Sequence, residues 1–572
     1  MTEASSSDKR ISLLLVIFFL LAAAILSRMF YWQVLKHSVY IALAEGQRSV
    51  LSKLFPTRGE IFISDKGGSD YFPVAMNKPG YLVYAVPIQI KDARSAAASL
   101  SKILELPEKE IEDRLSRPGD QYEIISRRVS EETVSKIKSL NLKGIQSESE
   151  NWRYWPENNF LSQVLGFVGF SGNKRAGQYG IEGFFNDRLE GKTGMIEAER
   201  GLGGFPISFG TKEYNPAENG DDIVLTIDRS IQYHVETALE ARSKELAALS
   251  GSAIVMEPAT GKILAMANWP GFDPNEYSAV KDLSVFKNPA IQGRYEPGSV
   301  IKPFTLAIAL DKKKIGPDTV YEDTGSLAID GWTIRNSDGK ANGLQTMTQV
   351  LEKSLNTGAV FASSQVDKSV FYDYFKYFGF NVPTGIELQG EIAGDLRNMD
   401  SQKEIAYANA SFGQGIAITP LELITAFSGL VNGGKLMKPY IVDKIIHEDG
   451  SEEKTKPETV RQVISPESSA KISAMMVRVV EDGHAKRAAI KGYWIGGKTG
   501  TAQVPFPDKR GYSDKTIHTF AGFGPIPDPR FVILVKIDEP KNARFAESSV
   551  VPVFNDIARF MVNYLEIPAN RK

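Results

Sequence analysis

An apolar run near the N-terminus constrains the fold more than any other feature of this sequence. Residues 11–27 are almost continuously apolar, Arg28 interrupts them, and residues 29–35 are again mostly apolar with three aromatic side chains. This length is close to what a helix needs to cross the hydrocarbon layer, about 17–25 residues. The polar residues 1–10 end in two basic side chains, which predicts a cytoplasmic tail followed by an uncleaved transmembrane signal anchor over residues 11–35. A cleaved signal peptide is the alternative, although no small-residue cleavage site ends the run cleanly.

Composition narrows the classes of protein that the remaining chain can belong to. A length of 572 residues indicates more than one domain, and 42% hydrophobic with 24% charged residues is ordinary for globular proteins. The net charge of -2 gives no argument for binding nucleic acid. The absence of cysteine excludes disulfides, thiolate metal sites and cysteine nucleophiles. No metal site or cofactor is predicted, since no two of the five histidines are closely spaced, and each is expected on the surface or in a loop: His37, His234, His447, His484 and His518.

A loop over residues 215–222 marks the predicted boundary between two folded regions. Residues 36–220 have mixed character, with helical spacing over 92–140, and contain no visible nucleophile and base pair, so a non-catalytic pedestal is predicted there. For residues 221–572 the pattern predicts an α+β domain with a central antiparallel sheet flanked by helices. Its predicted elements are a strand at 223–227, a helix at 230–249, a hairpin of 252–257 with 262–268, strands at 496–504, 518–525 and 531–538, and a helix at 551–565.

The strongest candidate for chemistry is Ser299 with Lys302. Pro297 and Gly298 break the chain just before Ser299, and a strongly apolar run follows, as in a buried helix. Residues three apart on a helix share a face, so the amine can lie beside the hydroxyl and take its proton if burial or a second cation keeps the amine neutral. The spacing alone is weak, because Ser-x-x-Lys also begins at Ser6, Ser99, Ser135, Ser171, Ser284 and Ser337.

Two later motifs complete an ordered set. Ser354-Leu-Asn356 lies 55 residues after Ser299, and Lys498-Thr499-Gly500-Thr501 begins 144 residues after Ser354. Each motif has copies elsewhere in the chain, so the order of the three carries the signal. A phosphate-binding loop is an alternative reading of residues 492–499. It is disfavoured because bulky residues fill the loop and a helix cannot start after it.

The ordered set is the signature of penicillin-binding proteins and class A β-lactamases. The chain resembles a class B penicillin-binding protein, a monofunctional D,D-transpeptidase, over nearly its whole length. The segment after Ile61 departs from the family's usual Asp-Arg-Asn-Gly. Beyond the three motifs, the resemblance is carried by Arg58-Gly59-Glu60-Ile61, Gly180-Ile181-Glu182, Leu225-Thr226-Ile227-Asp228 with Gln232, Pro258 to Met266, Phe272-Asp-Pro-Asn275, Tyr295-Glu-Pro-Gly298, Gly413-Gln-Gly415 with Thr419-Pro420, and Gly497 to Thr501.

The resemblance implies a serine-transpeptidase domain on an elongated mixed α/β pedestal, with the catalytic domain outside the cytoplasmic membrane. It implies that an acyl group passes from the D-Ala-D-Ala end of one peptidoglycan stem peptide, through an ester on the serine, to an amine of a second stem peptide. By the same resemblance, Ser299 is the nucleophile, Lys302 is its base and Ser354 relays the proton. Asn356 orients the base and the substrate amide. The substrate carboxylate is bound by Lys498, Thr499 and Thr501, beside Gly500.

The same resemblance implies binding partners and leaves alternative functions open. The implied partners are stem peptides, β-lactam antibiotics, the membrane and a polytopic glycosyltransferase of wall synthesis. The segment between the anchor and Arg58 and the strand end at 536–540 favour a division enzyme, and an elongation enzyme stays open. A β-lactamase, an antibiotic sensor and a catalytically silent scaffold are the more remote readings.

Overall fold

The structure is a computed structural model of the chain. It describes residues 4–36, 49–68, 70–172, 174–199, 213–506, 508–509 and 511–571. The chain divides into two compact units, Met1–Pro56 with Gly191–Asn219 and Thr57–Glu190 with Gly220–Lys572. The predicted pedestal at 36–220 includes residues 37–48 and 200–212, which lie outside the described residues. His37 is one of them. The predicted boundary between pedestal and transpeptidase domain stays a prediction.

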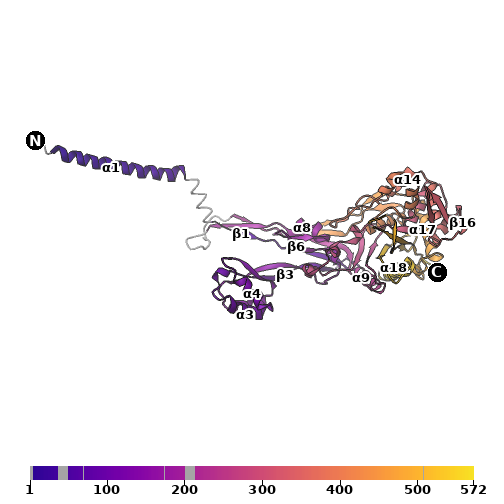
Figure 1. Cartoon of the computed structure of the whole chain (residues 1–572), viewed down its shortest axis with the longest axis horizontal. Coiled ribbons are helices and arrows are strands. Elements are labelled where there is room, and N and C mark those ends of the chain that lie inside the picture. Colours follow the sequence, from indigo (N-terminus) through magenta and orange to yellow (C-terminus); the bar gives the residue numbers. More distant parts are fainter. Residues whose placement is uncertain are drawn as a thin grey trace. The chain divides into compact units, whose positions relative to one another are not determined.

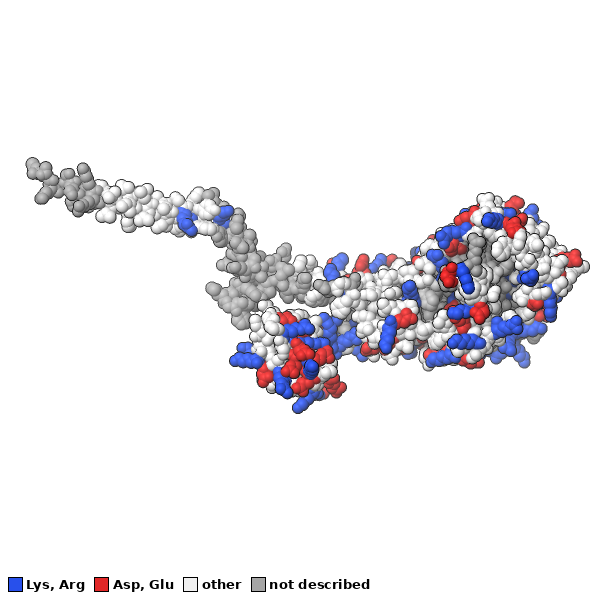
Figure 2. Space-filling view, viewed as in Figure 1, with Lys and Arg blue, Asp and Glu red and all other residues white. Residues whose placement is uncertain are grey.

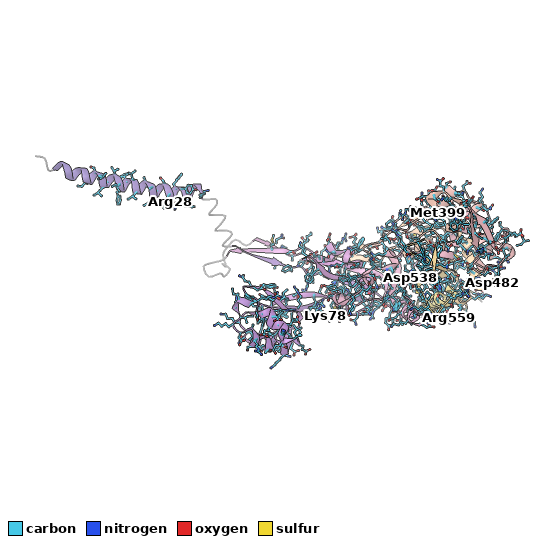
Figure 3. The ribbon with its side chains drawn as sticks, in the orientation of Figure 1. Arg28, Lys78, Met399, Asp482, Asp538 and Arg559 are labelled. Carbon is cyan, nitrogen blue, oxygen red and sulfur yellow. The ribbon has the colours of Figure 1, made fainter. Side chains whose placement is uncertain are left out.

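The first unit contains the apolar N-terminal helix. Helix α1 (Ala4–Phe30) continues into the π-helical η1 (Tyr31–Leu35) (Figure 1). Within them Ile11–Gln33 is 23 residues long, has a mean hydropathy of 2.6 and is not covered by protein, so its length and composition suffice to cross a membrane. Arg28 lies in the last turn of α1 (Figure 3), where a long side chain can reach the interface. The unit also holds an antiparallel sheet, β1-β8-β9: Ser49–Leu54, Gly194–Glu199 and Glu213–Asn215.

The second unit begins with a seven-stranded sheet that joins distant parts of the chain. Its order is β19-β18-β10-β2-β3-β4, with β5 also paired to β3. Strands β2 and β10 are parallel and the other pairs are antiparallel. The strands are β2 (Ile61–Ser64), β3 (Tyr71–Ala85), β4 (Glu123–Val129), β5 (Ile145–Tyr154), β10 (Asp222–Asp228), β18 (Val442–Ile446) and β19 (Glu452–Lys454).

A small lobe at one end of β3 has its own apolar core. Helices α3 (Ala93–Leu104), α4 (Glu108–Leu115) and α5 (Glu131–Ser139) bury Ala97, Leu100 and Ile111 with side chains of β3 and β4. The helical spacing predicted over 92–140 is therefore correct for three helices, while β4 interrupts it as a strand.

A buried ion cluster lies at the other end of β5. The Glu182 carboxylate is fully buried and pairs with Arg153 at 2.5 Å and with Arg58 at 2.6 Å. The two guanidinium groups hold the pKa of Glu182 below its usual value, although burial opposes them. The cluster ties the Arg58 motif to the Gly180-Ile181-Glu182 motif, so two motifs of the family resemblance meet here.

The core of the second unit is a five-stranded antiparallel sheet with helices on both faces (Figure 1). On β22 (Tyr512–Gly524), the ring centroid of Phe520 lies 4.8 Å from that of Phe554 in α18 (Ala546–Tyr564). The ring centroid of Phe523 lies 6.1 Å from that of Phe427 in α16 (Pro420–Val431). Side chains three apart on a strand point to opposite faces, so α18 and α16 cover opposite sides. The sheet order is β12 (Ile263–Trp269), β11 (Ser250–Met256), β23 (Phe531–Asp538), β22 (Tyr512–Gly524) and β21 (Gly496–Pro505).

The helices of this layer begin at residues that can cap them. Asp228 caps α9 (Arg229–Glu245) by accepting a hydrogen bond from the Ile231 N–H, and Thr419 and Glu422 form a capping box on α16 (Pro420–Val431). Helix α18 (Ala546–Tyr564) packs beside α9, and α17 (Pro466–Glu481) packs on β21. The α+β class and the predicted hairpin, strands and closing helix are confirmed.

The remaining described elements are short. They are η2 (Pro87–Gln89), α6 (Ser162–Leu165), β6 (Phe167–Ser171), β7 (Lys174–Gln178), α7 (Gly180–Phe184), α8 (Asn186–Glu190), η3 (Pro274–Ala279), η4 (Leu283–Phe286), α10 (Pro289–Gln292), β13 (Val320–Asp323), β14 (Ser326–Ile329), β15 (Trp332–Arg335), β16 (Gly343–Thr346), α14 (Lys368–Tyr377), η6 (Arg397–Ser401), α15 (Glu404–Ala410), β17 (Lys435–Met437), β20 (Thr459–Gln462) and η7 (Lys486–Ala488).

One histidine prediction is wrong. His518 is fully buried in β22, where its ring contacts Ser549 Oγ at 2.7 Å and Thr516 Oγ1 at 3.0 Å. Burial lowers the pKa of His518 to about 4, so the ring is neutral. Cationic and anionic side chains are interspersed on the face drawn in Figure 2, in keeping with the small net charge.

Candidate active site

Ser299 lies where an irregular segment becomes a buried helix. Gly298, with φ of +61°, turns the chain into the 3₁₀ segment η5 (Gly298–Ile301), and α11 (Lys302–Asp311) follows directly. Phe304 fixes α11 by contacting three further aromatic rings in the core. Ser299 is half-buried, and its hydroxyl makes no hydrogen bond to any residue that the structure describes. The helix start therefore presents a hydroxyl that is free to react.

Lys302, one turn after Ser299, is a buried amine whose charged form is disfavoured. Its side chain is fully buried, and Nζ donates to the Ser354 carbonyl oxygen at 2.5 Å and to Ser354 Oγ at 3.2 Å. Burial, and then the charge of Lys498, lower the pKa of Lys302 well below the usual value for lysine. A neutral buried amine can accept a proton, which is the property that the sequence analysis required of this residue.

Ser354 lies between two amines. The capping box of Thr346 and Gln349 starts α12 (Met347–Glu352), which ends two residues before Ser354. Ser354 has φ of +56°, a left-handed conformation that is costly for a residue with a Cβ and is concentrated at functional sites. This conformation places Oγ 3.2 Å from Lys302 Nζ and 2.9 Å from Lys498 Nζ.

Lys498 is the second buried amine. It lies on the edge strand β21, and its Nζ donates to Ser354 Oγ at 2.9 Å, to the Thr499 carbonyl oxygen at 3.1 Å and to Thr499 Oγ1 at 3.4 Å. Its side chain is fully buried, and burial lowers the pKa of Lys498 to about 7. Near neutral pH, an approaching carboxylate would favour the protonated form of this amine.

The residues after Lys498 lie along the free edge of the sheet. β21 is the last strand of the sheet and pairs only with β22 among the strands that the structure describes, so alternate backbone groups of β21 remain available to a ligand. Thr501 Oγ1 accepts a hydrogen bond from the Ala546 N–H at 3.2 Å, at the start of α18. An extended peptide can bind such an edge by adding a strand.

Gly500 allows β21 to approach the Ser299 segment. A Cβ at this position would lie 2.5 Å from the Pro297 carbonyl oxygen and 3.2 Å from the Val300 nitrogen. The first distance is far inside van der Waals contact, so any side chain here would push the strand away from η5. The close approach of Ser299 to the edge strand therefore depends on a glycine.

We expect Gly500→Ala to lower the free energy of unfolding by about 1–3 kcal/mol and acylation by about 10²-fold, because a displacement near 1 Å separates the reacting groups. Thermal melting and the rate of penicillin labelling measure the two effects. Gly316→Ala is the matched control, since its Cβ would meet only Thr319 Oγ1 at 3.8 Å. Labelling of G500A at the parent rate would contradict this role of the glycine.

Asn356 lies two residues after Ser354 in the chain, but its side chain is bonded elsewhere. Its amide nitrogen Nδ2 donates to the Arg335 carbonyl oxygen at 2.8 Å, and among the described residues no hydrogen bond joins its side chain to Lys302. Asn356 is the first residue of α13 (Asn356–Ser364), and its backbone N–H donates to Asn336 Oδ1 at 2.9 Å. The structure thus fixes the backbone of Asn356 and leaves the predicted orienting role of its side chain a prediction.

Sequence reasoning missed the groups that position these motifs. The buried carboxylate of Asp323 accepts hydrogen bonds from Thr357 Oγ1 at 2.6 Å and from Asn336 Nδ2 at 2.9 Å, which anchors the start of α13. At the start of the Ser299 segment, the Gly298 N–H donates to the Gly413 carbonyl oxygen at 3.0 Å. The Gly413 segment was visible in the sequence, but nothing in the sequence pairs Asp323 with Asn336.

The arrangement suits acyl transfer by a serine. It offers a free hydroxyl, a neutral amine one turn away, a second hydroxyl shared by two amines, and an edge strand beside them. Within the described residues, no group of three or more His, Asp or Glu side chains could hold a metal ion.

Two family profiles match the chain. The profile described as penicillin binding protein transpeptidase domain matches residues 251–559, which contain Ser299, Ser354 and Lys498. The profile described as penicillin-binding protein dimerisation domain matches residues 53–225.

Curated relatives and solved structures agree with these profiles over most of the chain. Stage V sporulation protein D of Bacillus subtilis is 33% identical and aligns with 96% of this chain and 85% of that protein. The probable peptidoglycan D,D-transpeptidase PbpC of Pseudomonas aeruginosa is 31% identical over 95% of this chain and 93% of that protein. A peptidoglycan synthetase structure from Bifidobacterium adolescentis is 25% identical, with a TM-score of 0.72, and covers 92% of this chain and 98% of its own. With one profile matching more than half of its length and relatives above 30% identity along nearly all of it, the chain belongs to the class B penicillin-binding proteins.

Proposed function

We propose that the protein crosslinks peptidoglycan by a serine acyl-enzyme mechanism in which Ser299 is the nucleophile. The donor is a stem peptide that ends in D-Ala-D-Ala, and the acceptor is an amine of a second stem peptide. The observation that carries this proposal is the pair of buried amines, Lys302 and Lys498, bonded to the same Ser354 hydroxyl. One amine is held neutral and can act as a base, while the other can bind a carboxylate.

The first half-reaction forms the acyl-enzyme. Ser299 Oγ attacks the carbonyl carbon of the penultimate D-Ala, its proton passes to Lys302, and the C–N bond to the last D-Ala breaks. The proton reaches the leaving amine through the Ser354 hydroxyl, which accepts hydrogen bonds from Lys302 and Lys498. We assign the binding of the developing oxyanion to the backbone N–H groups of Ser299 and Thr501, a contribution of about 10²–10³ in rate.

The second half-reaction releases the serine. The acceptor amine attacks the ester carbonyl carbon, a new C–N bond forms, the ester C–O bond breaks and Ser299 Oγ regains a proton through the same relay. The carboxylate of the donor lies on Lys498 with Thr499 and Thr501, and Asn356 orients the substrate amide. β-Lactams mimic the D-Ala-D-Ala amide, and their opened ring stays on Ser299 because no amine resolves it.

We infer the membrane orientation and the cellular role from the apolar N-terminal helix and from the relatives. The basic residues Lys9 and Arg10, which precede the apolar span Ile11–Gln33, favour an N-terminus in the cytoplasm and a catalytic domain outside the cytoplasmic membrane. The peptidoglycan D,D-transpeptidase FtsI homolog of Mesostigma viride is 29% identical and aligns with 98% of this chain and 96% of that protein, which favours a division role over elongation. The proposed partner is a polytopic membrane glycosyltransferase that polymerises the substrate strands.

Labelling with a fluorescent penicillin tests the proposal. We expect one modified serine, mapped to the peptide that contains Ser299, and an adduct that persists for hours, as a transpeptidase would give. Incubation with a D-Ala-D-Ala peptide and a second stem peptide should release D-Ala and form an amide-linked dimer. Loss of the adduct within seconds would identify a β-lactam hydrolase, and no labelling with unchanged wall crosslinking would identify a scaffold.

A further inference from the structure

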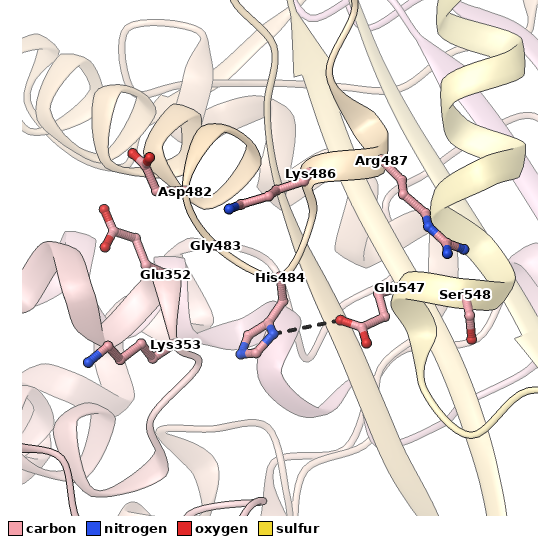
Figure 4. A pocket seen from close by; sticks show the side chains of 9 residues that line it. All are labelled: Glu352, Lys353, Asp482, Gly483, His484, Lys486, Arg487, Glu547 and Ser548. Atoms are coloured by element: carbon pink, nitrogen blue, oxygen red, sulfur yellow. Dashed lines mark ion pairs between the residues drawn. The ribbon is translucent and has the colours of Figure 1, made fainter.

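A charged cavity of about 470 Å³ adjoins the candidate active site (Figure 4). Its walls come from the C-terminal end of α12, the turn after α17 and the start of α18. Asp482, which directly follows α17 and lines the cavity, is labelled in Figure 3. Its volume is within the range of cavities that hold small ligands, about 300–1,000 Å³. The catalytic motifs do not line it, so the mechanism described above leaves it unused.

The acidic side chains of the cavity are already paired. Glu352 and Asp482 both pair with Arg478, at 3.5 Å and 2.6 Å. Glu547 pairs with His484 at 3.6 Å, as the dashed line in Figure 4 shows. One guanidinium, that of Arg478, therefore serves both Glu352 and Asp482, while Glu547 has the His484 ring as its partner.

Three cations of the cavity have no such partner. Lys353, Lys486 and Arg487 line the cavity and are exposed, and none has an ion pair with a residue in the described part of the chain. In Figure 4, the Lys486 side chain extends toward Asp482, whereas the Arg487 side chain extends toward the helix that carries Glu547 and Ser548. Exposed lysine and arginine side chains without an ion-pair partner in a concave site can bind the carboxylates of a ligand.

The lining residues of the cavity neighbour the residues that are assigned to the leaving group. Lys353 directly precedes Ser354, and Glu547 directly follows Ala546, whose N–H donates to Thr501 Oγ1 at 3.2 Å. Ser354 and Thr501 are the residues assigned to the leaving amine and its carboxylate. An acceptor amine must attack the acyl carbon from the side that the leaving amine vacates, because the second half-reaction reverses the geometry of the first.

We propose that this cavity binds the acceptor stem peptide, with its carboxylate groups held by Lys486 and Arg487 and with Lys353 at the rim. The inference rests on the proposed transpeptidase function and adds a subsite to it. The cavity thus selects an acceptor long enough to place carboxylates in it over a small amino acid that occupies only the position beside Ser299.

The test compares two acceptors in the full-length protein and in the variant Lys486→Gln/Arg487→Gln. One acceptor is a synthetic stem peptide with free carboxylates, and the other is D-alanine, which is too small to reach the cavity. We expect the KM ratio of stem peptide to D-alanine to rise about tenfold in the variant, because two exposed charge contacts are lost. Lys491→Gln is the matched control, since this lysine is exposed and does not line the cavity, and the ratio should stay unchanged.

The outcomes separate this inference from the proposed function. Failure of the parent protein to react with penicillin would refute the serine chemistry itself, because that reaction needs no acceptor. A variant that reacts with penicillin but keeps the parent KM ratio, or raises the KM of the donor instead, would overturn the acceptor subsite. If the double variant does not fold, Lys486→Gln and Arg487→Gln are measured singly, each with an expected change of about threefold, and an unchanged ratio in both would overturn the subsite equally.

Discussion

Ser299→Ala should abolish penicillin labelling and reduce transpeptidation by about 10⁴-fold or more. The substitution removes the atom that forms the ester, and loss of a nucleophile in a serine enzyme typically costs several orders of magnitude. The fold should survive, because Ser299 is half-buried and its hydroxyl has no hydrogen-bond partner among the described residues. We therefore expect a free energy of unfolding within about 0.5 kcal/mol of the parent value. Fluorescent penicillin labelling and thermal melting measure the two quantities on the same sample.

The chain offers a matched control for this experiment. Ser284 begins a Ser-x-x-Lys sequence that ends at Lys287, but it lies exposed in η4 rather than at the start of a buried helix. We expect Ser284→Ala to label like the parent protein. Undiminished labelling of the Ser299 variant, or a labelled peptide from another part of the chain, would refute the assignment of the nucleophile.

The contrast between Ser284 and Ser299 shows what the sequence could predict. Apolar periodicity and turn residues predicted the helix after Ser299, the β11–β12 hairpin and the three strands near the C-terminus, because those signals are local. The order of the three motifs then selected Ser299, Ser354 and Lys498 among several copies of each. The meeting of Lys302 and Lys498 at the Ser354 hydroxyl is non-local, and only the structure shows it.

Non-local pairing explains most of what the sequence did not predict. β2 and β10 are parallel neighbours although about 160 residues separate them, and no local pattern encodes that register. His518 was expected at the surface, yet its hydrogen bonds to Ser549 and Thr516 satisfy a buried neutral ring. The charged cavity was not predicted either. Lys353 follows α12 and Lys486 lies in η7, and the two line one cavity only in the folded chain.

Lys302→Met should lower the acylation rate by about 10³-fold, within the range of about 10²–10⁴ for loss of a general base. Methionine has a similar length and no branch, so it can fill the same buried space without accepting a proton. The exposed Lys314→Met, just after the same helix, is the matched control and should acylate at the parent rate. Acylation of the Lys302 variant within tenfold of the parent rate would exclude this lysine as the base.

The same substitution should change the pH dependence of stability in a defined direction. The pKa of Lys302 in the folded protein is well below that of the unfolded chain, because burial and Lys498 disfavour its charge. At a pH between these two pKa values, the Lys302 side chain is protonated in the unfolded chain and unprotonated in the folded protein. The parent protein's free energy of unfolding therefore rises with pH by up to about 1.4 kcal/mol per unit.

The methionine side chain of the Lys302→Met variant would bind no proton, so this contribution disappears from the variant. Its stability advantage over the parent protein should be largest at the acidic end of that window and shrink toward pH 10. The lost hydrogen bonds to Ser354 offset part of the advantage at every pH. Denaturant unfolding at pH 6, 7.5 and 9 measures the difference between the two proteins. A difference that stays constant across this range would mean that Lys302 is charged in the folded protein, and a charged amine could not take the proton of Ser299.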